Sequence, residues 1–281
     1  MFWFRIILNC SFILLTFVPP AISEDIQGQW VEGYKNRTRL YSGTVKGEPS
    51  VTIYAFIEIE MAKGWKTYWR NPGTAGGIAP EFDFGKSKNI RHVEVLYPVP
   101  ELFSDSAGDT IGYKERIIFP IAIQQHSKAE PIDLDLTANY GICEKLCVPV
   151  EVNLKLNIPP DFLIPASEDA LAALLSVPRQ KGSLLQGDPR DLTVTQFFSE
   201  GSPHILLSAR FPGSAEEARI FLDVEGGKYI PIPSQKEIKD EIITFKLDLS
   251  DPQILVSLRG SQVRVTMKGQ SGQSEDTFVI N

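Results

Sequence analysis

The cysteine pair Cys143 and Cys147 constrains the local fold of this chain more than any other feature of its 281 residues. A disulfide requires Cα atoms about 4.4–6.8 Å apart, whereas four steps along a straight strand span about 13 Å. If the two sulfurs are bonded, residues 141–148 therefore cannot form a regular strand. Strand-like patterns at 132–138 and 150–158 lead into and out of this segment, so we expect the cysteines at the tip of a β-hairpin.

The first half of the chain shows the alternation of apolar and polar residues that is typical of β-strands. Residues 150–158 alternate cleanly, and further strands are predicted at 50–60, 116–123 and 132–138. Prolines at 159 and 160 end this block. Short strands with turn residues between them predict an all-β sandwich.

The β pattern returns in the second half of the chain. Strands are predicted at 192–198, 204–211, 218–224, 242–249, 262–268 and 276–280. This half contains no cysteine and no recognisable catalytic grouping. We predict a second, smaller sandwich whose simplest role is spacing or docking.

A single helix is predicted between the two β-rich halves, at 167–176. Ser167 can cap its N-terminus, and acidic residues follow in the first turn. The expected organisation is a signal peptide at 1–23, a first sandwich domain at 24–160, a helical linker at 161–187 and a second sandwich domain at 188–281. The alternative is that the helix packs as part of the first domain.

The first 23 residues have the features of a secretory signal peptide. Arg5 is their only charge, an apolar run follows at 6–18, and the small residues Ala21 and Ser23 precede Glu24. The alternative is an uncleaved anchor, although the run is shorter than the ~20 residues of a spanning helix. Cleavage would remove Cys10 and take the net charge from −7 to −8, which argues against a nucleic-acid partner. Export implies an oxidising compartment in which a disulfide can form.

Three interpretations of Cys143 and Cys147 remain open from the residues alone. A structural disulfide is one, although a ring of about five residues contributes only ~2 kcal/mol by the chain-entropy model. A metal site is weak, because tetrahedral sites usually need four ligands and the three histidines lack ligand spacing. The third is a redox-active pair, in which Lys145 favours a thiolate and Glu144 opposes it.

Three further stretches stand out from the β pattern. Residues 64–80 carry three aromatics that run into a loop rich in Gly and Pro, which predicts either a core plug or a functional loop. Residues 97–103 end in Phe103, and a glycine-flanked stretch follows at 108–113. An exposed aromatic in such a loop could fold over a disulfide, or the loop could be an ordinary strand connection.

Together these motifs resemble the N-terminal periplasmic domain of the DsbD and ScsB thiol:disulfide interchange proteins. The motifs, in order, are GWKTYWRNPGTAG, YPVPELF, IGYKERIIFP and NYGICEKLCVP. The resemblance covers residues 30–158. It is closer to the ScsB-like branch, which carries the W-x-T-Y-W-R motif and a second β domain. It implies an immunoglobulin-like fold for the sandwich, with the redox pair on a hairpin.

The resemblance also implies roles for particular residues. Cys143 and Cys147 match the redox pair. Phe103, followed by Tyr113, is the best match to an aromatic cap over the disulfide, and Tyr140 precedes the first cysteine as an aromatic does in the family. In the family, electrons pass from a membrane-embedded reductase and its thioredoxin-like domain to periplasmic disulfide isomerases, cytochrome c maturation thioredoxins or copper-resistance proteins. No metal, flavin or nucleotide cofactor is implied.

Two departures from the family pattern qualify this expectation. The DsbD pair has a longer spacing than the C-x3-C of this chain, and the family proteins continue into membrane helices and a thioredoxin-like domain. We therefore expect a separate membrane protein to supply electrons to an exported thiol:disulfide interchange protein. The alternative is a non-enzymatic periplasmic binding or accessory protein with a structural Cys143–Cys147 disulfide.

Overall fold

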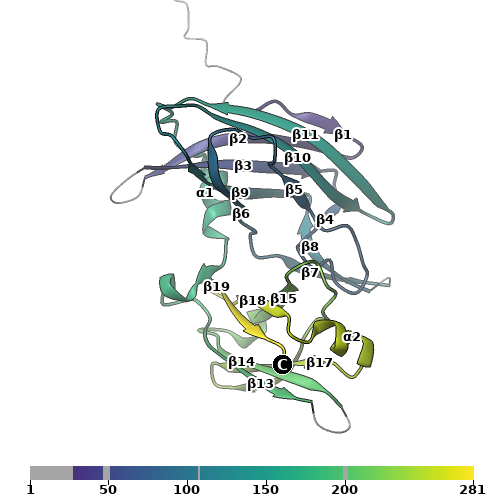
Figure 1. The fold of residues 1–281 in the computed structure, drawn as a ribbon. Helices are drawn as coiled ribbons and strands as arrows, with labels where there is room; N and C mark the ends of the chain where they lie inside the picture. The colour runs from purple at the N-terminus through teal and green to yellow at the C-terminus, as the bar shows by residue number, and fades with distance from the viewer. Residues whose placement is uncertain (1–27, 47–50, 107, 199–201) are drawn as a thin grey trace, which may run out of the picture.

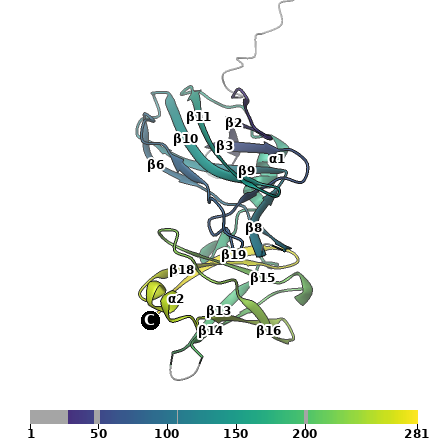
Figure 2. The same cartoon turned by 90° about the vertical axis from the view of Figure 1, so that its right-hand side faces the viewer.

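The computed structural model describes residues 28–46, 51–106, 108–198 and 202–281. The predicted signal peptide at 1–23 lies outside these residues. Within them, no helix is long and apolar enough to cross a membrane. The fold is all-β, as predicted, with two β-sandwiches stacked end to end and the C-terminus in the second (Figure 1 and Figure 2).

The first sandwich packs a five-stranded sheet against a six-stranded sheet. The five-stranded sheet contains, in spatial order, β1 (Val31–Gly33), β2 (Asn36–Lys46), β3 (Val51–Met61), β9 (Arg116–Gln125) and β6 (Ile90–Val95). The six-stranded sheet contains β11 (Cys147–Ile158), β10 (Ile132–Cys143), β4 (Lys66–Tyr68), β8 (Gly108–Lys114) and β7 (Glu101–Asp105), with β5 (Glu81–Asp83) also paired to β10.

Alternating apolar residues hold these two sheets together. On β10, Leu134, Leu136, Ala138, Tyr140 and Ile142 are all buried, because every second side chain points to the same face. They pack against the buried face of β3 in one continuous core. The intervening residues of β10, which include Cys143, therefore lie on the outer face of the six-stranded sheet.

The predicted helix forms as α1 (Glu168–Leu175), and Ser167 caps it by accepting a hydrogen bond from the amide of Ala170. Ala170 and Ala173 pack against Ile118 of β9 and neighbouring aromatics of the first sandwich. The helix thus covers the first sandwich, as the alternative had it, rather than standing free. The division into domains at 160 and 188 stays a prediction.

The segment predicted as a linker is hydrogen-bonded to both sandwiches. On one side of α1, the backbone of Thr44 exchanges hydrogen bonds with Ile164 and Ala166, at 2.8 and 2.9 Å. On the other side, the short strand β12 (Arg179–Gln180) pairs with a strand of the second sandwich, and the single turn η2 (Lys181–Ser183) follows. These bonds restrict how far the two sandwiches can move apart.

The second sandwich packs two four-stranded sheets around its own core. One sheet contains β12, β19 (Gln273–Val279), β18 (Gln262–Lys268) and β15 (Arg219–Val224). The other contains β13 (Arg190–Phe197), β14 (His204–Arg210), β17 (Ile242–Asp248) and β16 (Ser234–Lys239). The turn η3 (Ala215–Glu217) precedes β15, and the helix α2 (Pro252–Leu258), which was not predicted, precedes β18.

The residues that follow β4 join the two sandwiches. Trp69 is fully buried and packs edge-on against Phe221 of β15, with ring centroids 6.1 Å apart. Arg70 donates to Glu275 of β19 at 2.8 Å. The buried side chain of Asn71 donates to the carbonyls of Leu222 and Ile230, at 3.0 and 3.2 Å. Three successive residues of one motif therefore dock the second sandwich.

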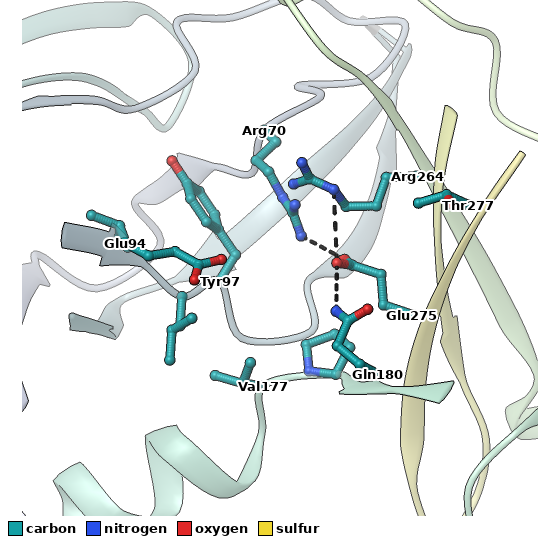
Figure 3. Close-up of a pocket in the computed structure, with 11 residues that line it drawn as sticks. Arg70, Glu94, Tyr97, Val177, Gln180, Arg264, Glu275 and Thr277 are labelled. Carbon is teal, nitrogen blue, oxygen red and sulfur yellow. Dashed lines mark hydrogen bonds and ion pairs between the residues drawn. The ribbon is translucent and has the colours of Figure 1, made fainter. Parts of the chain in front are cut away.

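A polar cavity of about 510 Å³ lies beside this junction, with Arg70 and Glu275 on its wall (Figure 3). Arg264 and Asp223 complete a cluster of two positive and two negative side chains. Burial raises the pKa of Asp223, and the positive charge of Arg70 acts against that shift. The guanidinium of Arg70 also lies over the ring of Tyr97, 5.0 Å from its centroid.

Replacement of Asn71 by alanine tests the junction. The change leaves two buried carbonyls without their donor, so the free energy of unfolding should fall by about 1–3 kcal/mol. Urea unfolding followed by tryptophan fluorescence is suitable, because Trp69 lies at the same junction. The exposed Asn153→Ala is the control and should change stability by less than about 0.5 kcal/mol. Equal effects of the two variants would contradict this role for Asn71.

Candidate functional site

The two cysteines lie at the tip of the hairpin formed by β10 and β11, as predicted. Cys143 is the last residue of β10, Cys147 is the first of β11, and their Cα atoms are direct cross-strand partners. Directly opposed residues in antiparallel strands have Cα atoms about 4.5–5.5 Å apart, which lies within the range of a disulfide. The chain reversal is confined to residues 144–146, so more of the cysteine segment is strand than we expected.

Gly141 and Pro149 are paired with each other in this hairpin. A Cβ atom on Gly141 would lie 2.9 Å from Cβ of Ile78 and 3.0 Å from Cε2 of Tyr68. Glycine is therefore needed here for close packing. Pro149 lies on β11, an edge strand of the sheet, where a missing backbone donor is tolerated.

The two thiols differ in exposure. Both are free cysteines in this structure; Cys147 is exposed and Cys143 is half-buried. The thiol of Cys147 is hydrogen-bonded to the hydroxyl of Tyr68, whose ring is 1% exposed. A partner molecule thus reaches the sulfur of Cys147 more easily than that of Cys143.

The hydroxyl of Tyr68 remains protonated over the ordinary pH range. Burial, followed by hydrogen bonding to the two thiols, raises the pKa of Tyr68 well above its usual 10.0. When Cys147 is ionised, the hydrogen bond between them must run from the Tyr68 hydroxyl to the thiolate. Such a charge-assisted hydrogen bond stabilises the thiolate.

Opposing influences act on Cys143. Burial raises the pKa of its thiol, and the neighbouring Cys147 raises it further. The hydrogen bond with Tyr68 and the positive charge of Lys66 lower it. The net direction is upward, so at neutral pH the reduced form of Cys143 is mainly the thiol.

Lys66 of β4 is the Cα partner of Cys143 in the neighbouring strand, so the two side chains share one face of the sheet. Its ammonium group donates to the hydroxyl of Thr110 at 3.1 Å and lies 3.3 Å from the carboxylate of Asp105. The hydroxyl of Thr67, next to it, donates to the carbonyl of Gly141 at 2.7 Å and ties β4 to β10.

Phe103 lies on the same outer face as the cysteines. The register pairs Phe103 with Thr110 across β7 and β8, and Thr110 contacts Lys66, which faces Cys143. The ring of Phe103 is half-buried, and its centroid lies 6.0 Å from the Lys66 ammonium. In the sheet order, β8 and β4 lie between the strand of Phe103 and that of Cys143, and Lys66 of β4 contacts the ring. Phe103 thus shares the face of the cysteine pair, and its cap role stays a prediction.

Tyr113 and Tyr140 lie on the opposite, inner face of the same sheet, so the expectation that they surround the cysteines is corrected. Tyr113 donates to the carbonyl of Pro98 at 2.7 Å and packs edge-on against Phe119. Tyr140 is fully buried, and its hydroxyl contacts the side chains of Asn36 and Thr38. The alternation of β8 and β10 turns both rings into the core.

Tyr68 and Lys66 are the residues of this site that sequence reasoning missed. Both belong to the motif GWKTYWRNPG, which was predicted to form a core plug or a functional loop. Its first Trp and Trp69 are buried, whereas Lys66 and Tyr68 alternate onto the cysteine face. A three-residue strand is too short for its periodicity to be recognised.

In the part of the chain that the structure describes, no three His, Cys, Asp or Glu side chains are grouped to hold a metal ion. The described site therefore consists of two thiols, a buried tyrosine hydroxyl and a lysine ammonium. Neighbouring thiols with unequal exposure define a class of site suited to thiol–disulfide exchange.

Comparisons with known proteins agree with this class. Residues 46–159 match the family model described as thiol:disulfide interchange protein DsbD, N-terminal. This region is thus a domain of the DsbD/ScsB N-terminal family, as the motifs predicted.

The fold is similar to a crystal structure of the N-terminal periplasmic domain of ScsB from Proteus mirabilis. The TM-score is 0.66 at 20% identity, and the match covers 92% of this chain and 100% of that one. At this identity the likeness shows the fold. No match to a curated protein was found.

Proposed function

We propose that this chain is an exported thiol:disulfide interchange protein that carries electrons on Cys143 and Cys147. The observation that carries the proposal is that the two thiols are direct cross-strand neighbours of unequal exposure. This arrangement suits an internal disulfide with one sulfur open to a partner. The match of residues 46–159 to the DsbD family supports the same chemistry.

The proposed electron donor is a membrane-embedded thiol reductase or its thioredoxin-like domain, and the recipients are disulfide-bonded client proteins of the periplasm. The similar ScsB domain is described as periplasmic, and disulfides persist in such oxidising compartments. Candidate clients are disulfide isomerases, cytochrome c maturation thioredoxins and copper-resistance proteins. In this proposal residues 1–23 direct export, 24–160 carry the redox site, and 188–281 serve for spacing or docking.

The exchange takes place in two balanced steps. A thiolate of the reduced donor attacks the sulfur of Cys147, which forms a mixed disulfide and releases Cys143 as a thiolate that takes up a proton. The donor's second thiolate then attacks the sulfur of the donor's first cysteine in the mixed disulfide and releases Cys147 as a thiolate. Two electrons pass to this chain, the donor becomes a disulfide, and the reverse steps reduce a client. No metal, flavin or nucleotide takes part.

Cys147 is the proposed point of attack because it is the exposed member of the pair. Tyr68 donates a hydrogen bond to this sulfur whenever it is a thiolate. Phe103 is proposed to limit the access of unwanted oxidants, since it lies on the cysteine face of the β7–β8 hairpin, which β4 joins to β10.

Replacement of Cys143 by alanine should trap the mixed disulfide. In this variant the Cys147 thiolate attacks the disulfide of an oxidised partner and releases one of the partner's sulfurs as a thiolate. Without Cys143 the resulting mixed disulfide cannot be resolved from within the chain, so covalent complexes with oxidised thioredoxin-fold proteins or disulfide-bonded periplasmic clients should accumulate. Non-reducing electrophoresis and mass spectrometry would identify the bond and its cysteine.

The matched control is Cys147→Ala, which leaves only the half-buried Cys143 and should yield far fewer complexes. If neither variant forms complexes under the same conditions, the pair is a structural disulfide, and the chain is a binding or accessory protein.

Replacement of Phe103 by alanine tests the cap. Removing the ring should make the two thiols more accessible and increase the rate at which a small disulfide oxidises them, by about tenfold or less. A tenfold change in rate corresponds to about 1.4 kcal/mol of activation free energy. Stopped-flow measurement with a small aromatic disulfide would give the rate. The control is Leu102→Ala, the preceding residue, whose side chain points to the other face of β7. Equal rates for Phe103→Ala and the unchanged protein would remove Phe103 from this role.

A further inference from the structure

A mostly buried lysine lies beside the half-buried cysteine. The side chain of Lys66 is 13% exposed, and its Cα is the cross-strand partner of the Cys143 Cα. A buried ammonium group is costly unless charges or hydrogen-bond acceptors compensate it. The surroundings of Lys66 therefore indicate what its charge does.

The ammonium group of Lys66 contacts the hairpin that carries Phe103. The Thr110 hydroxyl of β8 accepts a hydrogen bond at 3.1 Å, and the Asp105 carboxylate of β7 lies at 3.3 Å. The Asp105 side chain is 49% exposed, so solvent screens this ion pair strongly. On its other side, Lys66 faces the sulfur-bearing residue Cys143.

We propose that Lys66 is a positioning residue of the cysteine pair: Thr110 and Asp105 hold its ammonium group where it stabilises Cys143 as the leaving thiolate when a partner attacks Cys147. This inference rests on the proposed function and assigns a role to a residue of the same site. A nearby cation favours a thiolate over a thiol. A more stable leaving thiolate departs faster in thiol–disulfide exchange.

Two residues of β4 act on different sulfurs of the pair. Tyr68 contacts the exposed Cys147, where the partner attacks, and Lys66 faces Cys143, which leaves. Because Lys66 also contacts Thr110 and Asp105, its ammonium links the hairpin that carries Phe103 to the leaving sulfur. A negative charge on Cys143 competes with Asp105 for the same ammonium group.

The charged and titratable groups around Cys143 determine in which direction each substitution should shift the pKa of its thiol. Tyr68 and Lys66 face it from β4, Cys147 faces it from β11, and Glu144 follows it in the turn. Lys66 in turn faces Asp105 of β7 and has Lys114 of β8 as its other cross-strand partner. Removing Lys66 takes a positive charge from Cys143, whereas neutralising Asp105 removes the competitor for that charge.

The test measures each thiol separately in the reduced, full-length protein. Lys145 lies between the cysteines, so trypsin places Cys143 and Cys147 in different peptides. Timed alkylation with iodoacetamide over a pH series, followed by quenching, digestion and mass spectrometry, gives a pH profile for each cysteine. Near-UV circular dichroism confirms that each variant is folded.

Lys66→Met should move the Cys143 profile to higher pH and slow its alkylation at pH 7 by about two- to fivefold, the factor of a partly exposed ion pair. The Cys147 profile should change less. Lys66→Arg keeps the charge and should restore the Cys143 profile. Asp105→Asn should shift the Cys143 profile in the opposite direction, to lower pH.

The matched control is Lys114→Met, which removes the same charge from an exposed lysine on the same face of the sheet. In this control the alkylation rate of Cys143 at pH 7 should stay within about twofold of the rate in the unchanged protein. Equal shifts for Lys66→Met and Lys114→Met would overturn the inference, as would an unchanged profile for Lys66→Met. If Lys66→Met does not fold, Asp105→Asn decides. A Cys143 alkylation profile that is unchanged in Asp105→Asn, or shifted to higher pH, overturns the inference.

The test of Lys66 and the test of the proposed function can fail independently of each other. Alkylation profiles report the leaving sulfur whether or not a partner protein is present, whereas trapping with Cys143→Ala reports exchange with a partner. A Lys66 effect without trapping would reject the exchange function alone, and trapping without a Lys66 effect would reject this inference alone.

Discussion

The pairing of β4 with β10 is the interaction on which the rest of the site depends. It rests on a short register, in which Lys66 is opposite Cys143 and Thr67 opposite Ile142, and on the hydrogen bond from Thr67 to the Gly141 carbonyl. This pairing places a lysine and a tyrosine on the cysteine face of the sheet. Without it the hairpin tip would be an ordinary turn with two neighbouring thiols.

The same segment also attaches the second sandwich. Directly after Tyr68, which contacts Cys147, come Trp69, Arg70 and Asn71, which contact β15, β19 and the segment that follows β15. A shift of β4 would therefore change the contacts of the sulfurs and those at the junction between the sandwiches. The charged cluster of Arg70 and Glu275 is mostly buried, so its pairing is screened less by salt than a surface ion pair would be.

Much of the fold could be predicted because its signals are local. The alternation of β10 and β11 and the cap at Ser167 depend on neighbouring residues, and the hairpin tip follows from the length of a disulfide. The roles of Lys66, Tyr68 and Tyr140 could not be predicted, since a strand's two faces are assigned only by register with distant partners. Tyr140 was placed beside the cysteines by its position in the chain, yet the alternation of β10 turns it into the core. Helix α2 was missed although Asp251 and Pro252 are a cap and first-turn pair.

The equilibrium reduction potential of the Cys143–Cys147 pair in the mature protein tests the central claim most directly. It can be measured against a glutathione or dithiothreitol series, with the reduced fraction read by alkylation. An exchange function predicts rapid equilibration and a potential between about −120 and −270 mV, the range of known exchange proteins. A potential below about −300 mV with slow exchange would contradict the account and identify a structural disulfide.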